Sequence, residues 1–317
     1  RMALFRLYAG QGRLPQADAV LVQAIADHPE NAELLMVRAN FLARQNRHDE
    51  AEAALKQAVA LEPDSARPYL TLAAFYEANG APEKALAAYE QALAAKPEDS
   101  RIKTRLARFY LSRGRIDEAE GQVEALLAER PNYAPAKMLK AELLTARKAF
   151  GEALVLLDQL VADEPRAARA HYFKALAHLG QGEREVAQTA LSKTIELSPR
   201  DPRARLLMAE IHMGQREFDL ATKEARTALE IDPGSYRAKL ILGNAAMMTR
   251  DLERAEQWYR DLVASEPDNP VGYYRMGLLS RAREDRPAAL EYFERAVDME
   301  PGMLDATRQM VLVLGAE

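Results

Sequence analysis

Proline recurs in this chain at a spacing that never changes. Nine of the sixteen prolines lie thirty-four residues apart, with no insertion or deletion between them, and an alanine stands twelve residues before each one. Two fixed columns over nine copies indicate a repeat array, in which each unit stacks on its neighbours. The prolines are Pro29, Pro63, Pro97, Pro131, Pro165, Pro199, Pro233, Pro267 and Pro301, and the alanines are Ala17, Ala51, Ala85, Ala119, Ala153, Ala187, Ala221, Ala255 and Ala289.

Counting each of these prolines as position 32 divides the chain into repeats. We expect residues 1–317 to form a single array. Because the first repeat lacks its first three positions, we also expect the chain to be a piece of a longer protein. The repeats are a partial one at 1–31, complete ones at 32–65, 66–99, 100–133, 134–167, 168–201, 202–235, 236–269 and 270–303, and the start of a tenth at 304–317.

Apolar residues recur at helical spacing in both halves of each repeat. Positions 4, 7, 8 and 11 share one face of a first helix, and positions 20, 24, 27 and 28 share one face of a second. No proline lies inside either helix, while glycine lies at several of the turns between them. The pattern predicts nine helix pairs and no β-strand, with turns centred near residues 12, 46, 80, 114, 148, 182, 216, 250 and 284.

Residue size predicts how these helices pack. Position 8 is alanine or glycine in every complete repeat and position 20 is always alanine, so the two helices of a pair can approach closely. Position 10 is mostly large and apolar, as in Phe41 and Phe109, and lies on another side of the first helix. We therefore assign position 10 to the contact between successive repeats.

The segment 66–99 carries a recognisable pattern in both of its halves, formed by Tyr69, Leu72, Ala73 and Tyr76, then Ala85, Tyr89, Ala92 and Pro97. In period and pattern the chain resembles the tetratricopeptide repeat (TPR) family over essentially its whole length. The resemblance implies an all-α solenoid of antiparallel helix pairs, wound into a right-handed superhelix with the first helices on its concave side. In their richness in alanine, leucine and arginine, the repeats are similar to those of long bacterial TPR proteins.

Composition narrows the classes of function. A net charge of −5 and a pI near 5.8 weigh against general nucleic-acid binding. The absence of cysteine excludes disulfides, thiolate catalysis and cysteine metal sites. No apolar run reaches the roughly eighteen residues that span a bilayer. The sequence does not decide whether the protein resides in the bacterial cytoplasm or in the periplasm or cell envelope.

Histidine offers the one arrangement that suggests a metal. His178 and His212 occupy position 11 in adjacent repeats, but zinc needs three or four ligands and no suitably spaced carboxylate accompanies them. We interpret both as packing residues, and we assign Trp258 to helix packing as well. No catalytic motif is visible. We therefore expect no catalytic residue, no metal and no cofactor.

The TPR family offers two groove chemistries for comparison. Co-chaperones that hold the acidic tail of heat-shock chaperones carry lysine at position 5, which is absent here. Arrays attached to protein glycosyltransferases carry an asparagine ladder at position 9, where this chain has only Asn40 and Asn244. Neither chemistry is predicted.

Arginine at position 2 supplies a different candidate site. Helical geometry places position 2 with positions 5, 9 and 12 on the side away from the second helix. Asp64 is expected to neutralise Arg67, and Glu98 with Asp99 is expected to neutralise Arg101, which leaves repeats five to eight with net positive potential. Met213, Met247 and Met248 add flexible apolar side chains. The predicted partner-binding groove comprises Arg67, Arg101, Arg169, Arg203, Arg237, Tyr172, Leu176, Met213, Asn244, Met247 and Met248.

These observations favour a non-catalytic scaffold that binds an extended, acidic segment of a protein partner. A solvated polar face, whose arginines serve solubility, is the alternative for the strip itself. A second function is the substrate-presenting arm of a larger enzyme, and a third, nucleic-acid binding through arginine-rich helices, is the least favoured. We also expect the uncapped helix at 304–317 to associate end to end with another molecule or to fray, because nothing covers Met310, Val311 and Leu314.

Overall fold

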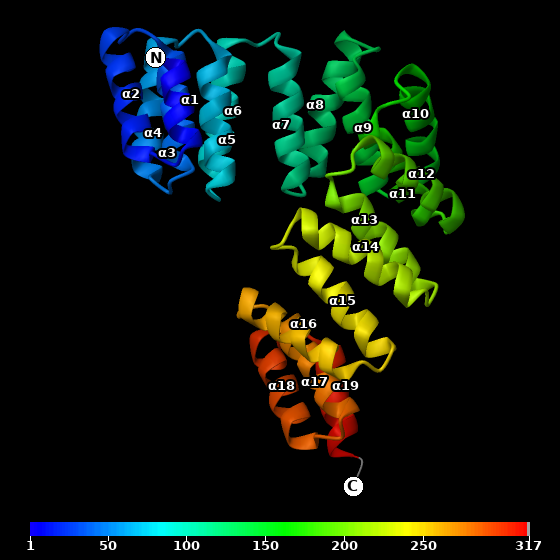
Figure 1. Ribbon diagram of the computed structural model, residues 1–317. Helices are drawn as coiled ribbons and strands as arrows, with labels where there is room; N and C mark the ends of the chain where they lie inside the picture. The colour runs from blue at the N-terminus through cyan, green and yellow to red at the C-terminus, as the bar shows by residue number, and fades with distance from the viewer. Residues whose placement is uncertain (316–317) are drawn as a thin grey trace. The chain divides into compact units, whose positions relative to one another are not determined.

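The computed structural model describes residues 1–315, which form nineteen helices and no strand (Figure 1). The first helices are α1 (Met2–Gly10), α3 (Ala32–Ala43), α5 (Ala66–Ala78), α7 (Ser100–Ser112), α9 (Ala134–Ala146), α11 (Ala168–Gly180), α13 (Pro202–Gly214), α15 (Tyr236–Met248), α17 (Pro270–Ala282) and α19 (Leu304–Leu314). The second helices are α2 (Leu14–Asp27), α4 (His48–Leu61), α6 (Pro82–Ala95), α8 (Ile116–Glu129), α10 (Phe150–Asp163), α12 (Arg184–Leu197), α14 (Phe218–Ile231), α16 (Leu252–Ser265) and α18 (Arg286–Met299). The predicted alternation of helices is confirmed.

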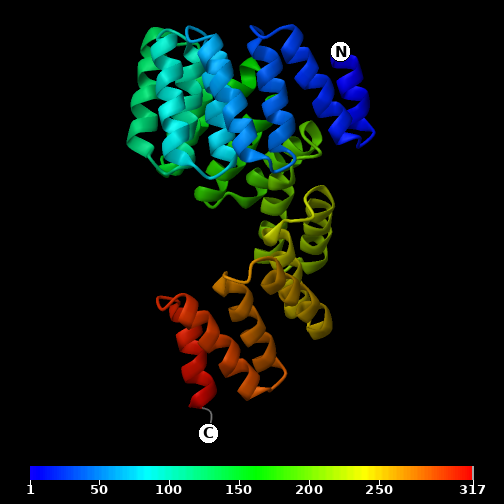
Figure 2. The same ribbon diagram turned by 90° about the vertical axis from the view of Figure 1, so that its left-hand side faces the viewer.

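The chain divides into two compact units, Arg1–Leu143 (unit 1) and Leu144–Glu317 (unit 2), with the boundary inside α9. Within each unit consecutive helices lie side by side and run antiparallel (Figures 1 and 2). Helix pairs such as α5 with α6 and α13 with α14 pack against each other along their length.

Each turn from a first to a second helix is built around one residue with a left-handed backbone. These residues are Gly12, Asn46, Gly80, Gly114, Lys148, Gly182, Arg216, Arg250 and Glu284, with φ between 60° and 83°. The next residue donates its N–H to the carbonyl five positions back, as Ala81 does to Tyr76 at 2.9 Å. This is the Schellman closure of a helix end. All nine predicted turn centres are confirmed.

The proline column fixes the opposite turn. Each second helix that precedes a position-32 proline ends two residues before it, as α6 ends at Ala95 before Pro97. The intervening residue Lys96 has φ −142° and ψ 76°, because a residue before proline is sterically excluded from the α region. An Asp, Asn or Ser side chain then caps several of the following helices, as Asp99 does at the start of α7.

Small residues bring paired helices together, as the sequence predicted. The alanines of positions 8 and 20, such as Ala73 and Ala85, are fully buried. Where position 8 is glycine, an aromatic ring of the second helix takes the freed space. A methyl group on Gly277 would lie only 2.5 Å from the ring of Phe293, and one on Gly243 only 2.4 Å from Tyr259.

Position 10 does connect successive repeats. The ring of Phe41 in α3 packs edge-on against Phe5 in α1, with centroids 5.3 Å apart. Phe109 in α7 similarly lies 5.6 Å from Tyr89 in α6. These contacts continue the core from one repeat to the next within unit 1.

Helix α19 leaves part of its apolar surface uncovered. Val311 and Leu314 are 64% and 58% exposed, as expected, whereas Met310 is half-buried against the cluster around Phe293 and Val313. Residues 316 and 317 of the expected tenth repeat lie outside the described range. Across residues 1–315, no helix combines the length and the apolar character needed to cross a membrane.

Candidate protein-binding surface

We use the term first-helix face for the surface formed by positions 2, 5, 9 and 12 of the first helices within a unit. Position 2 lies in the opening turn of its helix, where backbone N–H groups repel a cation. A position-2 arginine therefore needs a nearby carboxylate or an aromatic ring, and the structure supplies these in different ways in different repeats.

In unit 2 the face is centred on Tyr172 of α11. The guanidinium of Arg203 lies 5.3 Å from the centroid of the Tyr172 ring, a cation–π distance. Arg203 also forms an ion pair with Asp201, the cap of its own helix, at 2.5 Å. Arg237 of α15 binds both carboxylate oxygens of Glu210 on α13, each at 2.5 Å. Arg203 thus meets an aromatic ring and a carboxylate, and Arg237 meets a carboxylate of the preceding first helix.

The charges of this cluster act on one another. Burial raises the pKa of Tyr172, and the positive charges of Arg237 and Arg203 oppose that rise. The hydrogen bond from Arg203 lowers the pKa of Asp201. The hydrogen bond to Glu210 raises the pKa of Arg237 above its ordinary value. Tyr172, Arg203, Arg237, Asp201 and Glu210 therefore form one electrostatic group.

The remaining position-2 arginines are stabilised differently. Arg169 lies over the ring of Phe173 on its own helix, 5.9 Å from the centroid. Arg101 pairs with Asp99 at 2.7 Å, as the sequence predicted. Arg67 pairs instead with Glu33 of the preceding repeat at 2.9 Å, not with Asp64.

The expected excess of positive charge in the later repeats therefore needs a correction. Although only Gly234 and Ser235 precede Arg237 in sequence, Glu210 supplies its counter-charge from the preceding first helix. Glu210 lies at position 9, twenty-seven residues before the arginine, so local sequence could not reveal the pair.

The three predicted methionines lie in different surroundings. Met213 is partly buried in the cluster around Leu206 and Ile241, while Met247 belongs to a separate cluster around Tyr259. Met248 projects into solvent, 52% exposed. The three methionines therefore do not belong to one hydrophobic cluster.

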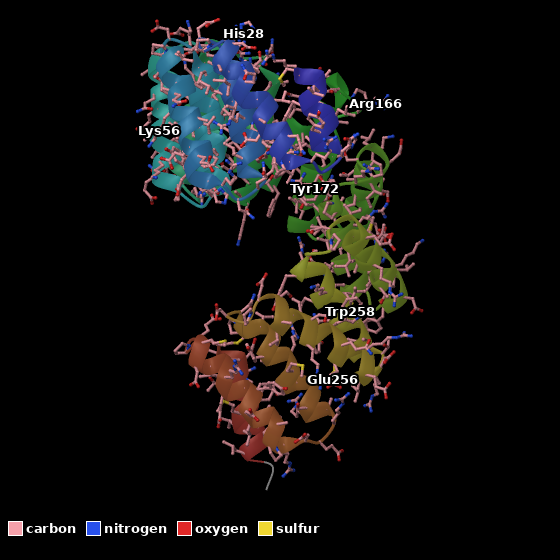
Figure 3. The ribbon with its side chains drawn as sticks, turned by 60° about the vertical axis from the view of Figure 1, so that its left-hand side comes forward. His28, Lys56, Arg166, Tyr172, Glu256 and Trp258 are labelled. Carbon is pink, nitrogen blue, oxygen red and sulfur yellow. The ribbon has the colours of Figure 1, made fainter. Side chains whose placement is uncertain are left out.

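Leu176 and Asn244 have structural contacts. Leu176 is half-buried against the cluster that contains Met208. Asn244 accepts a hydrogen bond from the hydroxyl of Tyr259 at 3.0 Å, which ties the first and second helices of its repeat. Trp258, labelled with Tyr172 in Figure 3, packs against the cluster around Leu206, as expected.

The two histidines of position 11 pair with carboxylates in their turns. Nδ1 of His178 lies 2.6 Å from Glu183, and Nδ1 of His212 lies 2.6 Å from Glu217. Within residues 1–315 no three histidine, aspartate or glutamate side chains gather as a metal site would require. The pairs support the interpretation of these histidines as packing residues.

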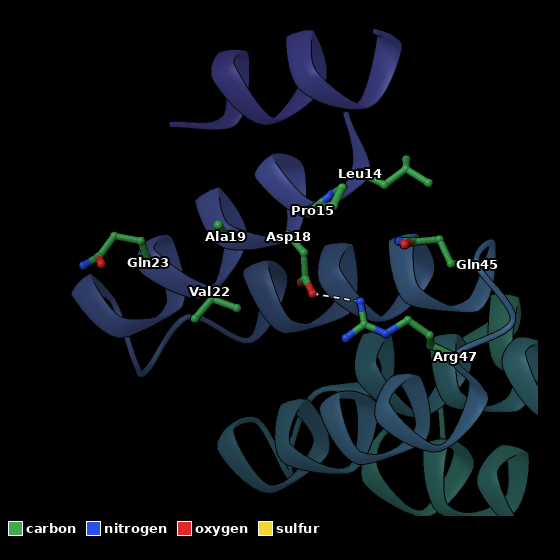
Figure 4. A pocket seen from close by; sticks show the side chains of 8 residues that line it. All are labelled: Leu14, Pro15, Asp18, Ala19, Val22, Gln23, Gln45 and Arg47. Atoms are coloured by element: carbon green, nitrogen blue, oxygen red, sulfur yellow. Dashed lines mark hydrogen bonds and ion pairs between the residues drawn. The ribbon is translucent and has the colours of Figure 1, made fainter. Parts of the chain in front are cut away.

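Unit 1 has two open hollows of interest. The larger, about 690 Å³, lies beside the second helix α2 and is lined by apolar residues such as Leu14 and Val22 (Figure 4). Burial acts to raise the pKa of Asp18 in this hollow, but hydrogen bonds from Arg38 and Arg47 lower it. Asp18 thus serves to join the first two repeats.

The other hollow, about 510 Å³, lies on the first-helix face between α5 and α7. It contains the predicted residues Arg67 and Arg101, together with Arg105, which sequence analysis did not single out. Arg105 lies at position 6, one helical turn after Arg101, and that spacing was the signal available in the sequence.

Two family models match the chain, and both are described as tetratricopeptide repeat. One matches residues 76–143 and 144–211, and the other matches residues 2–68, 44–100 and 206–270. No curated protein matches the chain.

Several solved structures share the fold. The APC/C hetero-tetramer Cut9-Hcn1 aligns with a TM-score of 0.66 and 16% identity over 95% of this chain and 59% of that one. A tetratricopeptide repeat protein from Parabacteroides merdae aligns at 0.55 and 16% identity, over 78% of this chain and 98% of that one. TTC0263, a thermophilic TPR protein of Thermus thermophilus, aligns at 0.53 and 25% identity, over 58% of this chain and all of its own. Because the family matches together span residues 2–270, this chain belongs to the tetratricopeptide repeat family.

Proposed function

We propose that this chain is a non-catalytic scaffold whose first-helix face in unit 2 binds an extended acidic segment of a protein partner. Arrays of this family are typically protein–protein interaction scaffolds. The observation that carries the proposal is the contact of Arg203 with the ring of Tyr172 together with the ion pair of Arg237 with Glu210, both on neighbouring first helices and both partly accessible to solvent.

The ion pairs of the cluster suit exchange with a ligand. Arg237 is 45% exposed and Glu210 is 41% exposed, and an ion pair of this kind contributes only about 0.2–1 kcal/mol. A carboxylate of the partner can therefore displace Glu210 at little cost. Arginine suits this exchange, because its planar guanidinium binds carboxylates through two parallel hydrogen bonds.

The surroundings of the arginines provide the rest of a binding surface. The ring of Tyr172 is half-buried and offers a hydroxyl as well as an apolar body. Leu176 and Met213 are also half-buried on the same first helices. An extended segment that alternates acidic and apolar side chains would match this pattern of guanidinium and apolar groups.

A charge-reversal experiment tests the proposal. The probe is a fluorescein-labelled peptide in which glutamate alternates with leucine, and its affinity is measured by fluorescence anisotropy at low and moderate salt. The variant Arg203→Glu/Arg237→Glu should bind at least about tenfold more weakly, since each charge-assisted hydrogen bond contributes about 1.5–3 kcal/mol. Its residual binding should also depend less on salt.

The matched control is Lys223→Glu/Arg226→Glu on the second helix α14, where both side chains are exposed. It changes the net charge by the same amount and should bind like the parent protein. Equal losses in the two variants, or no loss in either, would show that the arginines serve only solubility.

A further inference from the structure

We infer that Asn79 and Gly80, in the turn between α5 and α6, form a site of spontaneous covalent modification, at which the asparagine amide is lost as ammonia and an aspartate or isoaspartate residue remains. Residues 79 and 80 are the one place in the sequence where asparagine precedes glycine. The inference is independent of the proposed binding function.

The reaction needs an unhindered backbone nitrogen next to a short side-chain amide. After a base removes its proton, the nitrogen of Gly80 attacks Cγ of Asn79 and closes a five-membered succinimide ring. The bond from Cγ to Nδ2 breaks, and the departing nitrogen takes back the proton and leaves as ammonia. Water then opens the ring at one of its two carbonyl carbons, which gives aspartate or isoaspartate. Glycine suits the attack, because it has no Cβ that would crowd the nitrogen.

The structure leaves this turn accessible to water and base. Asn79 and Gly80 are both exposed, and a methyl group on Gly80 would meet no atom of residues 1–315 within 4 Å. Other asparagines lack one of these conditions. Asn269 precedes Pro270, whose nitrogen carries no hydrogen, and Asn244 lies inside α15, where the backbone is helical.

Both reacting groups are hydrogen-bonded while the turn is closed. Nδ2 of Asn79 donates to the carbonyl of Phe75 at 2.8 Å, and the N–H of Gly80 donates to the carbonyl of Glu77 at 3.2 Å. The nitrogen of Gly80 has to leave that hydrogen bond before it can attack. The reaction therefore proceeds through local opening of the turn, and its rate follows the population of the open form.

Neither product fits the closed turn. Isoaspartate adds a methylene group to the main chain, which displaces Ala81 from the carbonyl of Tyr76, to which its N–H donates at 2.9 Å. That bond is the Schellman closure of α5. Aspartate keeps the length of the main chain, but its carboxylate cannot donate to Phe75 and adds negative charge at the C-terminal end of a helix. Modification should therefore loosen the packing of α5 against α6 irreversibly.

Two equivalent turns supply internal controls. Gln11 precedes Gly12 and Gln181 precedes Gly182, at the same position of their repeats as Asn79, and both glycines have a left-handed backbone. Glutamine has to close a six-membered ring, which forms far more slowly than the five-membered one. These turns thus keep the glycine and the backbone conformation and differ by one methylene group of the side chain.

The experiment follows the full chain during incubation in mildly alkaline buffer at physiological temperature. Proteolysis and mass spectrometry measure the conversion of amide to acid at each position, and chromatography separates aspartate from isoaspartate. We expect modification of Asn79 to be several-fold faster than that of Asn132, which is also exposed in a turn but precedes Tyr133. Gln11 and Gln181 should stay intact over the same time. Urea below the unfolding transition should accelerate the reaction, because it populates the open turn.

Two variants separate the site from its surroundings. Arg113→Asn places the same pair in the turn before α8, where Gly114 also has a left-handed backbone, and should create a second reactive position. Asn79→Gln should abolish the reaction in the first turn, and incubation should lower the thermal midpoint of the parent protein more than that of this variant. Rates at Asn79 and Asn132 that are equal, an inert Arg113→Asn turn or equal midpoints would overturn the inference.

Discussion

Nδ1 of His178 lies 2.6 Å from Oε2 of Glu183 across the turn between α11 and α12. These residues are also joined through the backbone, since the N–H of Glu183 donates to the carbonyl of His178 at 2.9 Å. The same two positions hold Tyr110 and Arg115 in another repeat, where the guanidinium lies 4.5 Å from the ring centroid. In these two turns the flanking side chains are therefore matched as pairs.

Mixing members of the two pairs should destabilise the turn. Glu183→Arg places an arginine beside His178, and we expect it to lower the free energy of unfolding by about 0.5–1 kcal/mol, the value of an exposed ion pair or hydrogen bond. The double variant His178→Tyr/Glu183→Arg recreates the pair of the other repeat and should recover most of that loss. Urea unfolding at pH 7 measures both. A double variant no more stable than the single one would contradict the matching of pairs.

Five turns hold a side chain in the left-handed region, and four of these residues are Lys148, Arg216, Arg250 and Glu284. A left-handed backbone destabilises a residue that has a Cβ by about 1–2 kcal/mol. Glycine avoids this strain, but it also increases the entropy of the unfolded chain, which offsets part of the gain. Arg250→Gly should therefore stabilise the protein by about 0.5–1 kcal/mol.

The reciprocal variant Gly80→Ala should destabilise the protein by a similar amount, because Gly80 has φ 66° although a methyl group would meet no atom within 4 Å. The shift in the urea midpoint gives the sign for both changes. Stabilisation by Gly80→Ala would mean that the backbone conformation of this turn is not left-handed in solution.

The close approach at Gly277 predicts a rescue within one helix pair. Gly277→Ala forces a methyl group against Phe293 and should cost about 1–3 kcal/mol, as overpacking of a core does. Adding Phe293→Leu reproduces the combination of alanine with leucine found at Ala175 and Leu191, and should restore much of the stability. Thermal unfolding followed by circular dichroism compares the three proteins.

Gly121 is the control for that experiment. It lies inside α8, and a methyl group there would meet no atom within 4 Å. Gly121→Ala should therefore stabilise the protein by up to about 1 kcal/mol through helix propensity. If Gly121→Ala and Gly277→Ala changed stability equally, the contact with Phe293 would have no energetic effect.

The ionisation of Asp99 and Asp201 should make the stability of the fold depend on pH in the acid range. The hydrogen bond from the neighbouring arginine lowers the pKa of each carboxyl in the folded protein. Their contribution to stability is therefore fully present above the unfolded aspartate pKa, about 3.9, and is lost as pH falls through the lower folded value. Asp201→Asn should reduce the free energy of unfolding at pH 7, and the difference from the parent protein should vanish below the folded pKa. A difference that persists unchanged in acid would point to a cause other than ionisation.

Much of the fold could be predicted from the sequence, because it depends on local rules repeated nine times. The prolines of position 32 stop each second helix through their effect on the preceding residue, and the residue at each turn centre adopts a left-handed backbone whether it is Gly80 or Lys148. The small residues at positions 8 and 20 likewise predicted the close helix pairs.

The candidate site could be predicted only in part. The exposed arginines of position 2 were identified, but the partner of Arg237 lies one repeat earlier in Glu210, and the partner of Arg67 is Glu33. Such contacts depend on how neighbouring first helices are placed side by side.

The proposal that Arg237 binds a partner's carboxylate makes Glu210 its internal competitor. Removing that competitor should strengthen binding, whereas removing the arginine should weaken it. The affinity of the glutamate–leucine peptide for Glu210→Ala, measured by fluorescence anisotropy beside the parent protein, is the most direct test. We predict an affinity several-fold higher than that of the parent protein, of the order expected for about 1 kcal/mol, and a loss of that gain when Arg237→Gln is added. An unchanged or lower affinity for Glu210→Ala would contradict the assignment of this face as an acidic-peptide site.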